Sequence, residues 1–195
     1  MKVTFVGSWS DATAEADAAA SLIDQGAIIV SQHSDNTTPA TTAQRKNVFH
    51  TGYNADMTQV APSASLISTR IDWSVYFYEI IKAYSEGKDI PKDWCKGMKD
   101  NAVVMTALNK SIAPAGAETA MNKAITDIVN GRLQVFDLSK FTIGGTVPQN
   151  KDMYDSFAAV KENAIFDGAF HESYTQSAPY FVGRIDGIDW LNQAY

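Results

Sequence analysis

A tryptophan stands where the first predicted strand gives way to the first predicted helix. Residues 2–6 alternate like a short strand, and Gly7 and Ser8 break it. Ser10 or Asp11 then caps a helix by accepting its free N–H groups. This places Trp9 at the carboxyl end of a strand, where open α/β sheets bind ligands, so its flat indole could stack on a base or a sugar. The alternative is structural: Trp9 only covers the end of the sheet.

Two further polar loops follow the next two predicted strands. Residues 32–36 follow the second strand and residues 52–57 follow the third. Loops that follow successive parallel strands share one edge of the sheet. His33 and Asp35 could act there as a general base and its orienting carboxylate. Hydrogen bonding to a ligand, or capping of the next helix, is the alternative that we favour, because neighbouring loop residues need not face each other.

Other catalytic and metal-binding motifs are absent from the sequence. There is no G-x-G-x-x-G or P-loop motif for a nucleotide phosphate, and no G-x-S-x-G elbow for a serine nucleophile. His33, His50 and His171 are too widely spaced for a local metal motif. We therefore predict no catalytic residues, no metal and no cofactor.

Cys95 is the only cysteine of the chain. A single cysteine excludes an internal disulfide and a cysteine-based zinc site. Nearby lysines could lower the pKa of its thiol, but the sequence offers no partner base. These lysines are Lys92, Lys96 and Lys99.

The composition is that of an ordinary globular protein, with 195 residues, 45% hydrophobic and 19% charged. The net charge of -6 and the lack of a basic stripe exclude a nucleic-acid-binding surface. No apolar run approaches the roughly 18 residues that a membrane span requires. The first residues show no leader pattern, so the sequence as it stands predicts no export signal.

Strands and helices alternate as far as residue 137. Strands are expected at 2–6, 27–31, 47–51, 65–68 and 133–136, with a further strand or hairpin within 94–105. Helices are expected at 12–25, 72–86 and 116–130, and another begins at Thr38-Pro39. This order predicts an α/β lobe over residues 1–137, with a doubly wound, mostly parallel sheet of five or six strands flanked by helices.

Residues 138–195 differ from the lobe and are predicted to be an irregular, aromatic-rich extension. Gly144-Gly145, Pro148 and Asn150 mark turns, and few helical signals follow them. The aromatic residues of this extension are Tyr154, Phe157, Phe170, Tyr174, Tyr180, Phe181, Trp190 and Tyr195. We expect them to pack on the lobe, on a missing partner lobe or on a second copy of the chain.

A set of motifs, in order from residue 3 to about 137, resembles the basic membrane protein family of ABC-transporter substrate-binding lipoproteins. The motifs are Gly7-Ser8-Trp9-Ser10-Asp11, Leu22-Ile23-Asp24-Gln25-Gly26-Ala27, Gln32-His33-Ser34-Asp35, Gly52-Tyr53-Asn54-Ala55-Asp56-Met57, Ala61-Pro62 and Asp72-Trp73. Residues 136–145 and 177–181 also look like the carboxyl end of a subgroup from Gram-positive bacteria. Several members of the family bind purine nucleosides.

The resemblance implies a type I periplasmic-binding-protein fold, in which two hinged lobes clamp the ligand. This chain resembles the second lobe with the carboxyl-terminal segment, and the N-terminal lobe is missing. The chain then holds at most half of the cleft. A half-site should bind ligand more weakly than a closed clamp.

The resemblance also implies roles for particular residues. Trp9 matches the aromatic residue that stacks on the base in nucleoside-binding members. Asn54 matches a position where an aspartate often holds the ribose hydroxyls, and an amide makes the weaker hydrogen bond. Residues 32–35 replace a glycine-rich loop, which leaves the ligand open. The full predicted ligand-binding set is Ser8, Trp9, Asp11, Gln32, His33, Asp35, Tyr53, Asn54, Asp56, Trp73 and Met98.

The leading hypothesis is a non-enzymatic solute-binding component of an ABC importer that takes a nucleoside or similar small polar aromatic ligand. In the full-length protein it would be an extracytoplasmic lipoprotein that serves a permease. The alternative hypothesis is a ligand-sensing module of a regulator or sensor with the same fold. An enzyme that uses His33 and Asp35 is the third. Self-association through the surface that the other lobe would cover is also expected.

Overall fold

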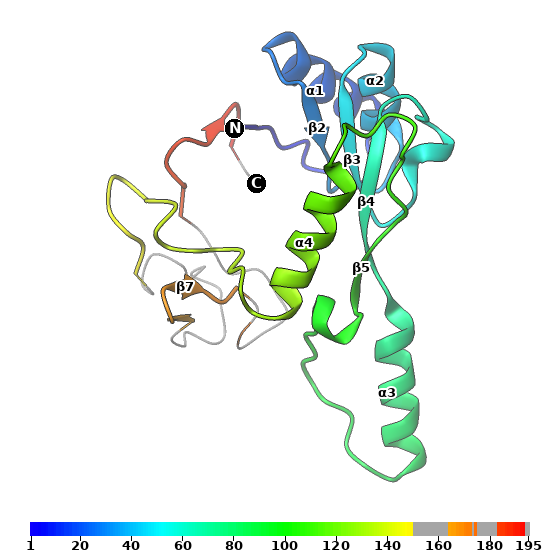
Figure 1. Ribbon diagram of the computed structural model, residues 1–195, viewed down its shortest axis with the longest axis vertical. Coiled ribbons are helices and arrows are strands. Elements are labelled where there is room, and N and C mark those ends of the chain that lie inside the picture. The colour runs from blue at the N-terminus through cyan, green and yellow to red at the C-terminus, as the bar shows by residue number, and fades with distance from the viewer. Residues whose placement is uncertain (150–163, 173, 175–182, 194–195) are drawn as a thin grey trace.

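The structure is a computed structural model that describes residues 1–149, 164–172, 174 and 183–193. The elements are β1 (Lys2–Val3), α1 (Ala12–Asp24), β2 (Ile29–Ser31), α2 (Thr38–Arg45), β3 (Phe49–Tyr53), η1 (Met57–Gln59), β4 (Ser65–Ile71), α3 (Trp73–Ser85), η2 (Met98–Asp100), β5 (Val103–Met105), α4 (Ala117–Val129), β6 (Ile165–Phe166), β7 (Ala169–Phe170) and β8 (Asp189–Trp190). Figure 1 shows α1 and α2 beside the upper part of the main sheet and α4 in front of it.

The main sheet has the strand order β2-β3-β4-β5. The first three strands are parallel, with Ile29 opposite Phe49 and Thr51 opposite Ile67, and β5 runs antiparallel to β4. Parallel neighbours need a crossover connection, which α2 supplies between β2 and β3. The predicted α/β fold with a mostly parallel sheet is confirmed.

Helix ends follow the signals in the sequence. The side chain of Asp11 accepts a hydrogen bond from the N–H of Ala14 at 2.9 Å and caps α1. Asp72 caps α3 in the same way through the N–H of Ser74 at 3.1 Å. The cap of α2 is Thr37, one residue before the predicted Thr38. The capping residues therefore fix where the loops end and the helices begin.

The core beneath α1 and α2 is built mainly from small side chains. Its buried residues are Ala19, Val30, Ala40, Ala43, Met57, Ala61 and Ala64, with Ile23 and Val48 packed against them. Alanine lets the two helices approach each other and the sheet closely, because it places only a methyl group between backbones. The core is therefore thin, and it sits under the edge that carries the polar loops.

The first strand was predicted within the main sheet, and this prediction is wrong. The two-residue β1 pairs in parallel with β8, and Lys2 lies opposite Asp189. The side-chain amide of Asn192 accepts from the N–H of Phe5 at 2.8 Å and donates to its carbonyl at 2.6 Å. The Phe5 ring also lies 5.1 Å from that of Trp190. The backbone N–H and carbonyl of Phe5 therefore find their hydrogen-bond partners in Asn192, and this part of the chain does not pair with β2.

The predicted strand at 133–136 is also absent, and the main sheet has four strands among the described residues instead of five or six. The carbonyl of Phe136 accepts from the N–H of Phe170, and the two rings lie 5.9 Å apart. This segment therefore joins a second cluster, formed by Leu138, Ala164 and Phe170.

The described part of the extension packs on the chain itself, through β8 and through this second cluster. Tyr154, Phe157, Tyr180, Phe181 and Tyr195, and the matching segment 177–181, lie outside the described residues.

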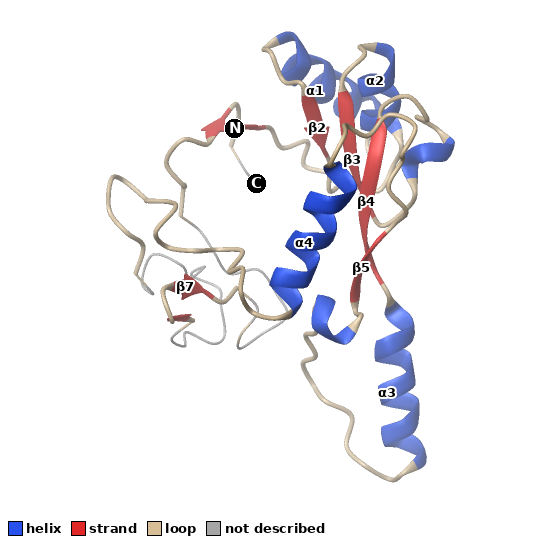
Figure 2. Cartoon of the chain, viewed as in Figure 1, coloured by secondary structure: helices blue, strands red, loops and turns tan. Residues whose placement is uncertain are grey.

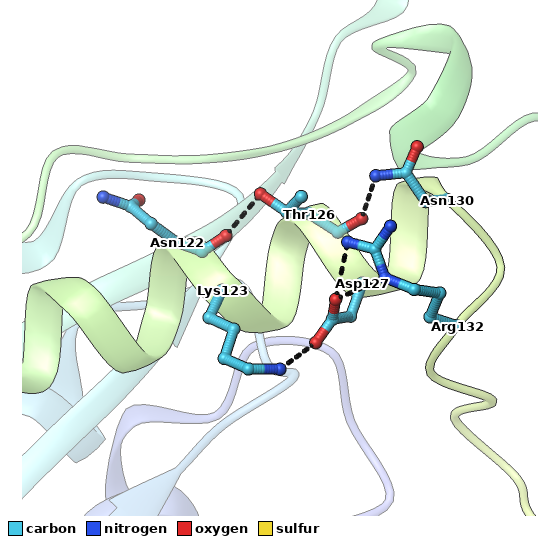
Figure 3. A network of polar contacts seen from close by, with 6 residues as sticks. All are labelled: Asn122, Lys123, Thr126, Asp127, Asn130 and Arg132. Carbon is cyan, nitrogen blue, oxygen red and sulfur yellow. Dashed lines mark hydrogen bonds and ion pairs between the residues drawn. The ribbon is translucent and has the colours of Figure 1, made fainter.

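The carboxyl end of α4 is tied by side chains (Figure 3). Asp127 bonds both Lys123 and the Arg132 guanidinium, whose Nε donates to it at 2.9 Å. Hydrogen bonding from Lys123 and then Arg132 lowers the pKa of Asp127 from its ordinary value. A carboxylate is disfavoured at a helix carboxyl end, so the two cations offset the unfavourable dipole.

Candidate functional site

Trp9 lies in the loop between β1 and α1, at the carboxyl edge of β2. Its side chain is 72% exposed. We call residues 7–11 the first rim loop and residues 32–37 the second rim loop. The carbonyl of Trp9 accepts a hydrogen bond from the N–H of Asp35 at 2.7 Å, which joins the two rim loops at this point. The backbone therefore holds the indole beside the residues that follow β2.

His33 and Tyr53 meet across the second and third loops. Their ring centroids are 5.1 Å apart at an interplanar angle of 32°. Asn54 follows with a left-handed φ of 63°, which asparagine tolerates better than most residues, and its N–H donates to the carbonyl of Thr69 at 2.7 Å. In the described part of the chain, no hydrogen bond engages the side chains of His33, Asp35 or Asn54.

A pocket of about 630 Å³ opens between the first rim loop, α1 and β2. Its lining includes Ser8, Trp9 and His33 at the rim, and apolar side chains such as Leu22 and Val30 deeper inside. Most of its wall is apolar with a few polar groups, which is the usual character of a small-molecule site.

A buried carboxylate connects the two rim loops. Glu15 of α1 is only 3% exposed. Its Oε1 accepts from the N–H of Asp11 at 2.9 Å and from the amide of Asn36 at 2.5 Å, while its Oε2 accepts from the hydroxyl of Ser34 at 2.5 Å. A buried carboxylate is costly unless such donors surround it. Glu15 therefore fixes the position of one loop relative to the other.

Gln32 continues this network into the sheet. Its Nε2 donates to the carbonyls of Ser34 at 3.0 Å and Asn36 at 2.7 Å, and its Oε1 lies 2.8 Å from Nε2 of His50. Nδ1 of His50 lies 3.3 Å from the hydroxyl of Ser65. Desolvation by burial lowers the pKa of His50 to about 4. The neutral imidazole is therefore part of a rigid support for the second rim loop.

Three predicted ligand residues serve their own loops in this structure. The hydroxyl of Ser8 accepts from the N–H of Ser10 at 3.1 Å. Asp11 caps α1, and Asp56 caps η1 by accepting from the N–H of Thr58 at 2.9 Å. Together with Gln32 they shape the edge, and ligand contact through their side chains stays a prediction.

Trp73 and Met98 are not brought to the pocket. Trp73 begins α3 and lies 6.2 Å from the ring of Tyr76. Met98 begins η2 and lines a second cavity between η2, β5 and α4. Of the predicted ligand residues, the lining of this pocket includes Ser8, Trp9, Gln32 and His33. Tyr53 lies against His33 but does not line the pocket, and neither do Asp11, Asp35, Asn54 and Asp56, so a ligand site that joins them stays a prediction.

Sequence reasoning missed Glu15, His50 and Ser65. A glutamate four residues after a capping aspartate in an alanine-rich helix is one available signal for Glu15. For His50 and Ser65 there was none, because their partnership depends on the register between β3 and β4.

The described residues do not pair His33 with Asp35 as a general base and its orienting carboxylate. No hydrogen bond joins His33 to Asp35 in the described residues. Within the same ranges, no group of three or more His, Cys, Asp or Glu side chains is placed to hold a metal ion. Across the described helices, none has both the length and the apolar character needed to span a bilayer.

Comparison with known proteins gives two relatives by sequence. A purine-binding protein of Brucella abortus is 32% identical over 142 residues, which are 73% of this chain and 39% of that protein. A putative ABC transporter glucose-binding protein of Haloferax volcanii is 28% identical over 142 residues, 72% of this chain and 36% of that protein. The chain thus spans about two fifths of the length of these relatives.

By structure, the chain is similar to a transcriptional activator of the comK gene from Bacillus halodurans. The TM-score is 0.57 at 20% identity, over 64% of this chain and 44% of the other. At that identity the likeness concerns the fold alone. The family model described as ABC transporter substrate-binding protein, PnrA-like, matches residues 1–139, which include both rim loops and the residues of the pocket. The chain belongs to this PnrA-like family of ABC transporter substrate-binding proteins.

Proposed function

We propose that the chain is the ligand-binding lobe of an ABC importer's solute receptor, and that it takes a purine base or nucleoside against Trp9. The observation that carries the proposal is the exposed indole at the mouth of a mostly apolar pocket. A flat ring stacked on the indole would displace water from that face of the indole. Stacking of a base on an aromatic side chain is worth about 1–3 kcal/mol.

Polar groups on the loops that follow β2 and β3 suit a base with a sugar attached. His33, Asp35 and Asn54 offer side chains that their own loops do not use. An imidazole and an amide can each donate or accept, and a carboxylate accepts from hydroxyls. A few such groups around an apolar wall give orientation and specificity to a small ligand.

One relative is named for purine binding and another for glucose binding. We favour the purine, because Trp9 presents a whole aromatic face and the pocket wall is mostly apolar. A sugar would rely more on hydrogen bonds than this wall provides.

The other parts of the proposal concern the longer protein, since the chain spans about two fifths of its relatives. A second lobe would close over Trp9 and supply the other half of the cleft. The closed receptor would deliver ligand to a permease from the extracytoplasmic side, anchored there as a lipoprotein. A regulatory role has only a likeness of fold in its favour.

Calorimetric titration of the chain with adenosine, guanosine, adenine and glucose tests the proposal. We expect a purine to bind and glucose not to bind. Trp9→Ala should weaken purine binding by about 5- to 150-fold, the equivalent of 1–3 kcal/mol. Trp9→Phe keeps a flat ring and should recover part of the affinity.

Tyr84→Ala is the matched control, since Tyr84 is 80% exposed and lies outside the pocket. Purine affinity that Trp9→Ala leaves unchanged would reject the site. Preference for glucose over every purine would reject the ligand class.

A further inference from the structure

One wall of the pocket does not belong to the main sheet. Residues 4–9 line the pocket without a break, together with residues of α1 and β2. We call residues 4–6 the wall segment, which joins β1 to the first rim loop. Figure 2 shows the N-terminus to one side of the main sheet, and β1 pairs with β8 in a small sheet of its own. The contacts of the wall segment with β8 and the residues around it therefore bear on the shape of the pocket.

The pairing of β1 with β8 continues into the wall segment through one side chain. Val3 lies opposite Trp190, and its carbonyl accepts from the N–H of Leu191 at 2.9 Å. The side-chain amide of Asn192 then accepts from the N–H of Phe5 at 2.8 Å and donates to the carbonyl of Phe5 at 2.6 Å. A primary amide carries a donor and an acceptor side by side, so Asn192 satisfies both backbone groups of Phe5 as a neighbouring strand would.

The ring of Phe5 is held from the same side. Its centroid lies 5.1 Å from that of Trp190, and the guanidinium of Arg184 lies over the Trp190 ring at 4.5 Å. Contacts between two aromatic rings, and between a cation and a ring, both add stabilisation to such a cluster. Phe5 is therefore fixed by its backbone and by its ring, and the partners of both come from residues 184–192.

The first rim loop is fixed to the main sheet at its other end. The carbonyl of Trp9 accepts from the N–H of Asp35 at 2.7 Å, and the N–H of Asp11 donates to Glu15 at 2.9 Å. Among the described residues, no hydrogen bond joins residues 6–8 to α1 or β2. Residues 6–8 are therefore held between the two fixed ends, Phe5 on one side and Trp9 on the other.

We infer that Asn192 is a positioning residue for the pocket, which holds Phe5 and so sets the place of residues 6–8 and of Trp9 relative to α1 and β2. The inference rests on the proposed function, because it concerns the same pocket. Asn192 is not among the residues that line the pocket, so it acts through Phe5 and without touching ligand. Without these two hydrogen bonds the wall loosens, and a ligand that binds there must first order it, which lowers the affinity.

Asn192→Ala tests the role of the amide, since it removes both bonds to Phe5 from an exposed side chain. We expect calorimetric titration with adenosine and guanosine to show a loss of affinity of about 3- to 10-fold. Asn130→Ala is the matched control: Asn130 is also exposed, lies outside the pocket and donates to the carbonyl of Thr126. This control should leave purine affinity unchanged.

The ring contact gives a second pair of variants. Trp190→Ala removes the partner of the Phe5 ring and should also weaken purine binding. Trp190→Phe keeps an aromatic ring against Phe5 and should recover most of the affinity. A change in overall stability alone would not restore binding in this way, because the melting temperature of each variant is measured beside its affinity.

A further measurement needs no ligand. Fluorotryptophan incorporated into the chain gives Trp9 its own fluorine NMR resonance, which is assigned by its loss in Trp9→Phe. We expect Asn192→Ala to shift or broaden this resonance in the ligand-free chain, because the first rim loop has lost one of its two fixed ends. Asn130→Ala should leave the resonance in place.

Circular dichroism shows whether each variant folds. A Trp9 resonance that folded Asn192→Ala leaves unchanged would overturn the inference, whatever the chain binds. Purine affinity that Asn192→Ala does not lower, or lowers no more than Asn130→Ala, would overturn it as well. If the unsubstituted chain binds no purine, the proposed function fails, and the Trp9 resonance still decides whether Asn192 positions this wall.

Discussion

His50 and Gln32 meet inside the sheet, with Nε2 of the imidazole 2.8 Å from Oε1 of the amide. Gln32 uses its Nε2 as a donor to two backbone carbonyls, so its Oε1 must accept. His50 therefore carries its proton on Nε2, and its Nδ1 accepts from the hydroxyl of Ser65. A neutral histidine satisfies every group in this chain of hydrogen bonds, and a second proton would not.

The first prediction is that stability falls as the solution becomes mildly acidic. Desolvation lowers the pKa of His50 from 6.5 to about 4 in the folded chain. The unfolded chain therefore binds the proton more readily, and stability that is complete above pH 6.5 is lost as pH falls toward 4. Between pH 8 and 5 the loss should be roughly 2 kcal/mol, measured by urea unfolding.

His50→Gln is the control for this pH effect. It removes the titrating group, and any loss of stability through altered packing is the same at every pH. The slope of unfolding free energy between pH 8 and 5 should then flatten. An unchanged slope would assign the pH dependence to other groups.

The second prediction separates two buried serines of β4. Ser65 is fully buried and bonds His50, whereas Ser68 is 1% exposed and its hydroxyl has no hydrogen-bond partner among the described residues. Ser65→Ala leaves Nδ1 of His50 unsatisfied and should cost about 1–3 kcal/mol of unfolding free energy. Ser68→Ala removes an unsatisfied hydroxyl and should be neutral or stabilising. Equal losses in urea titrations of both variants would contradict the hydrogen-bond assignment.

Sequence patterns predicted the elements whose causes are local. Asp11, one of the two residues expected to cap the first helix, caps α1, and the helix expected from residue 72 begins there with Asp72 as its cap. The loops after β2 and β3 share one edge because parallel strands require it. The rings of His33 and Tyr53 are in contact at that edge. Trp9 reaches it through a backbone bond to Asp35 that no local pattern encodes.

Non-local pairings were the part that the sequence could not supply. The partner of β1 is β8, nearly the whole chain away, and the choice depends on Asn192 meeting the backbone of Phe5. Residues 133–136 are apolar enough for a strand, yet they pack with Phe170. Glu15 and His50 found their partners only through the packing of α1 and the register of β3.

The third prediction concerns a glycine of β3. A Cβ at Gly52 would collide with the hydroxyl of Ser68 and lie 2.8 Å from Cγ of Met57. Gly52→Ala should therefore cost about 1–3 kcal/mol by overpacking. Gly97→Ala is the control, since nothing lies within 4 Å of a Cβ there. Thermal unfolding compares Gly52→Ala with Gly97→Ala. The double variant Gly52→Ala/Ser68→Ala should recover part of the stability that Gly52→Ala loses. Equal melting temperatures for Gly52→Ala and Gly97→Ala would show that Gly52 is not tightly packed.

The fourth prediction is that Glu15 supports ligand binding without touching ligand. Glu15→Ala leaves Asp11, Ser34 and Asn36 without their acceptor and should cost about 3 kcal/mol of unfolding free energy. Because the two rim loops then lose their common anchor, purine affinity should fall even at a temperature where the variant is fully folded.

Glu15→Gln distinguishes positioning from general stability. It retains an oxygen for Asp11 and Asn36, and its amide can donate to the hydroxyl of Ser34, so most of the affinity should return. Ala43, which is fully buried in the core away from the rim loops, gives the comparison: Ala43→Gly should lower stability and leave the affinity of the folded chain unchanged. If Glu15→Ala, fully folded, bound purine as tightly as the unsubstituted chain, the two loops would hold their relative position without it.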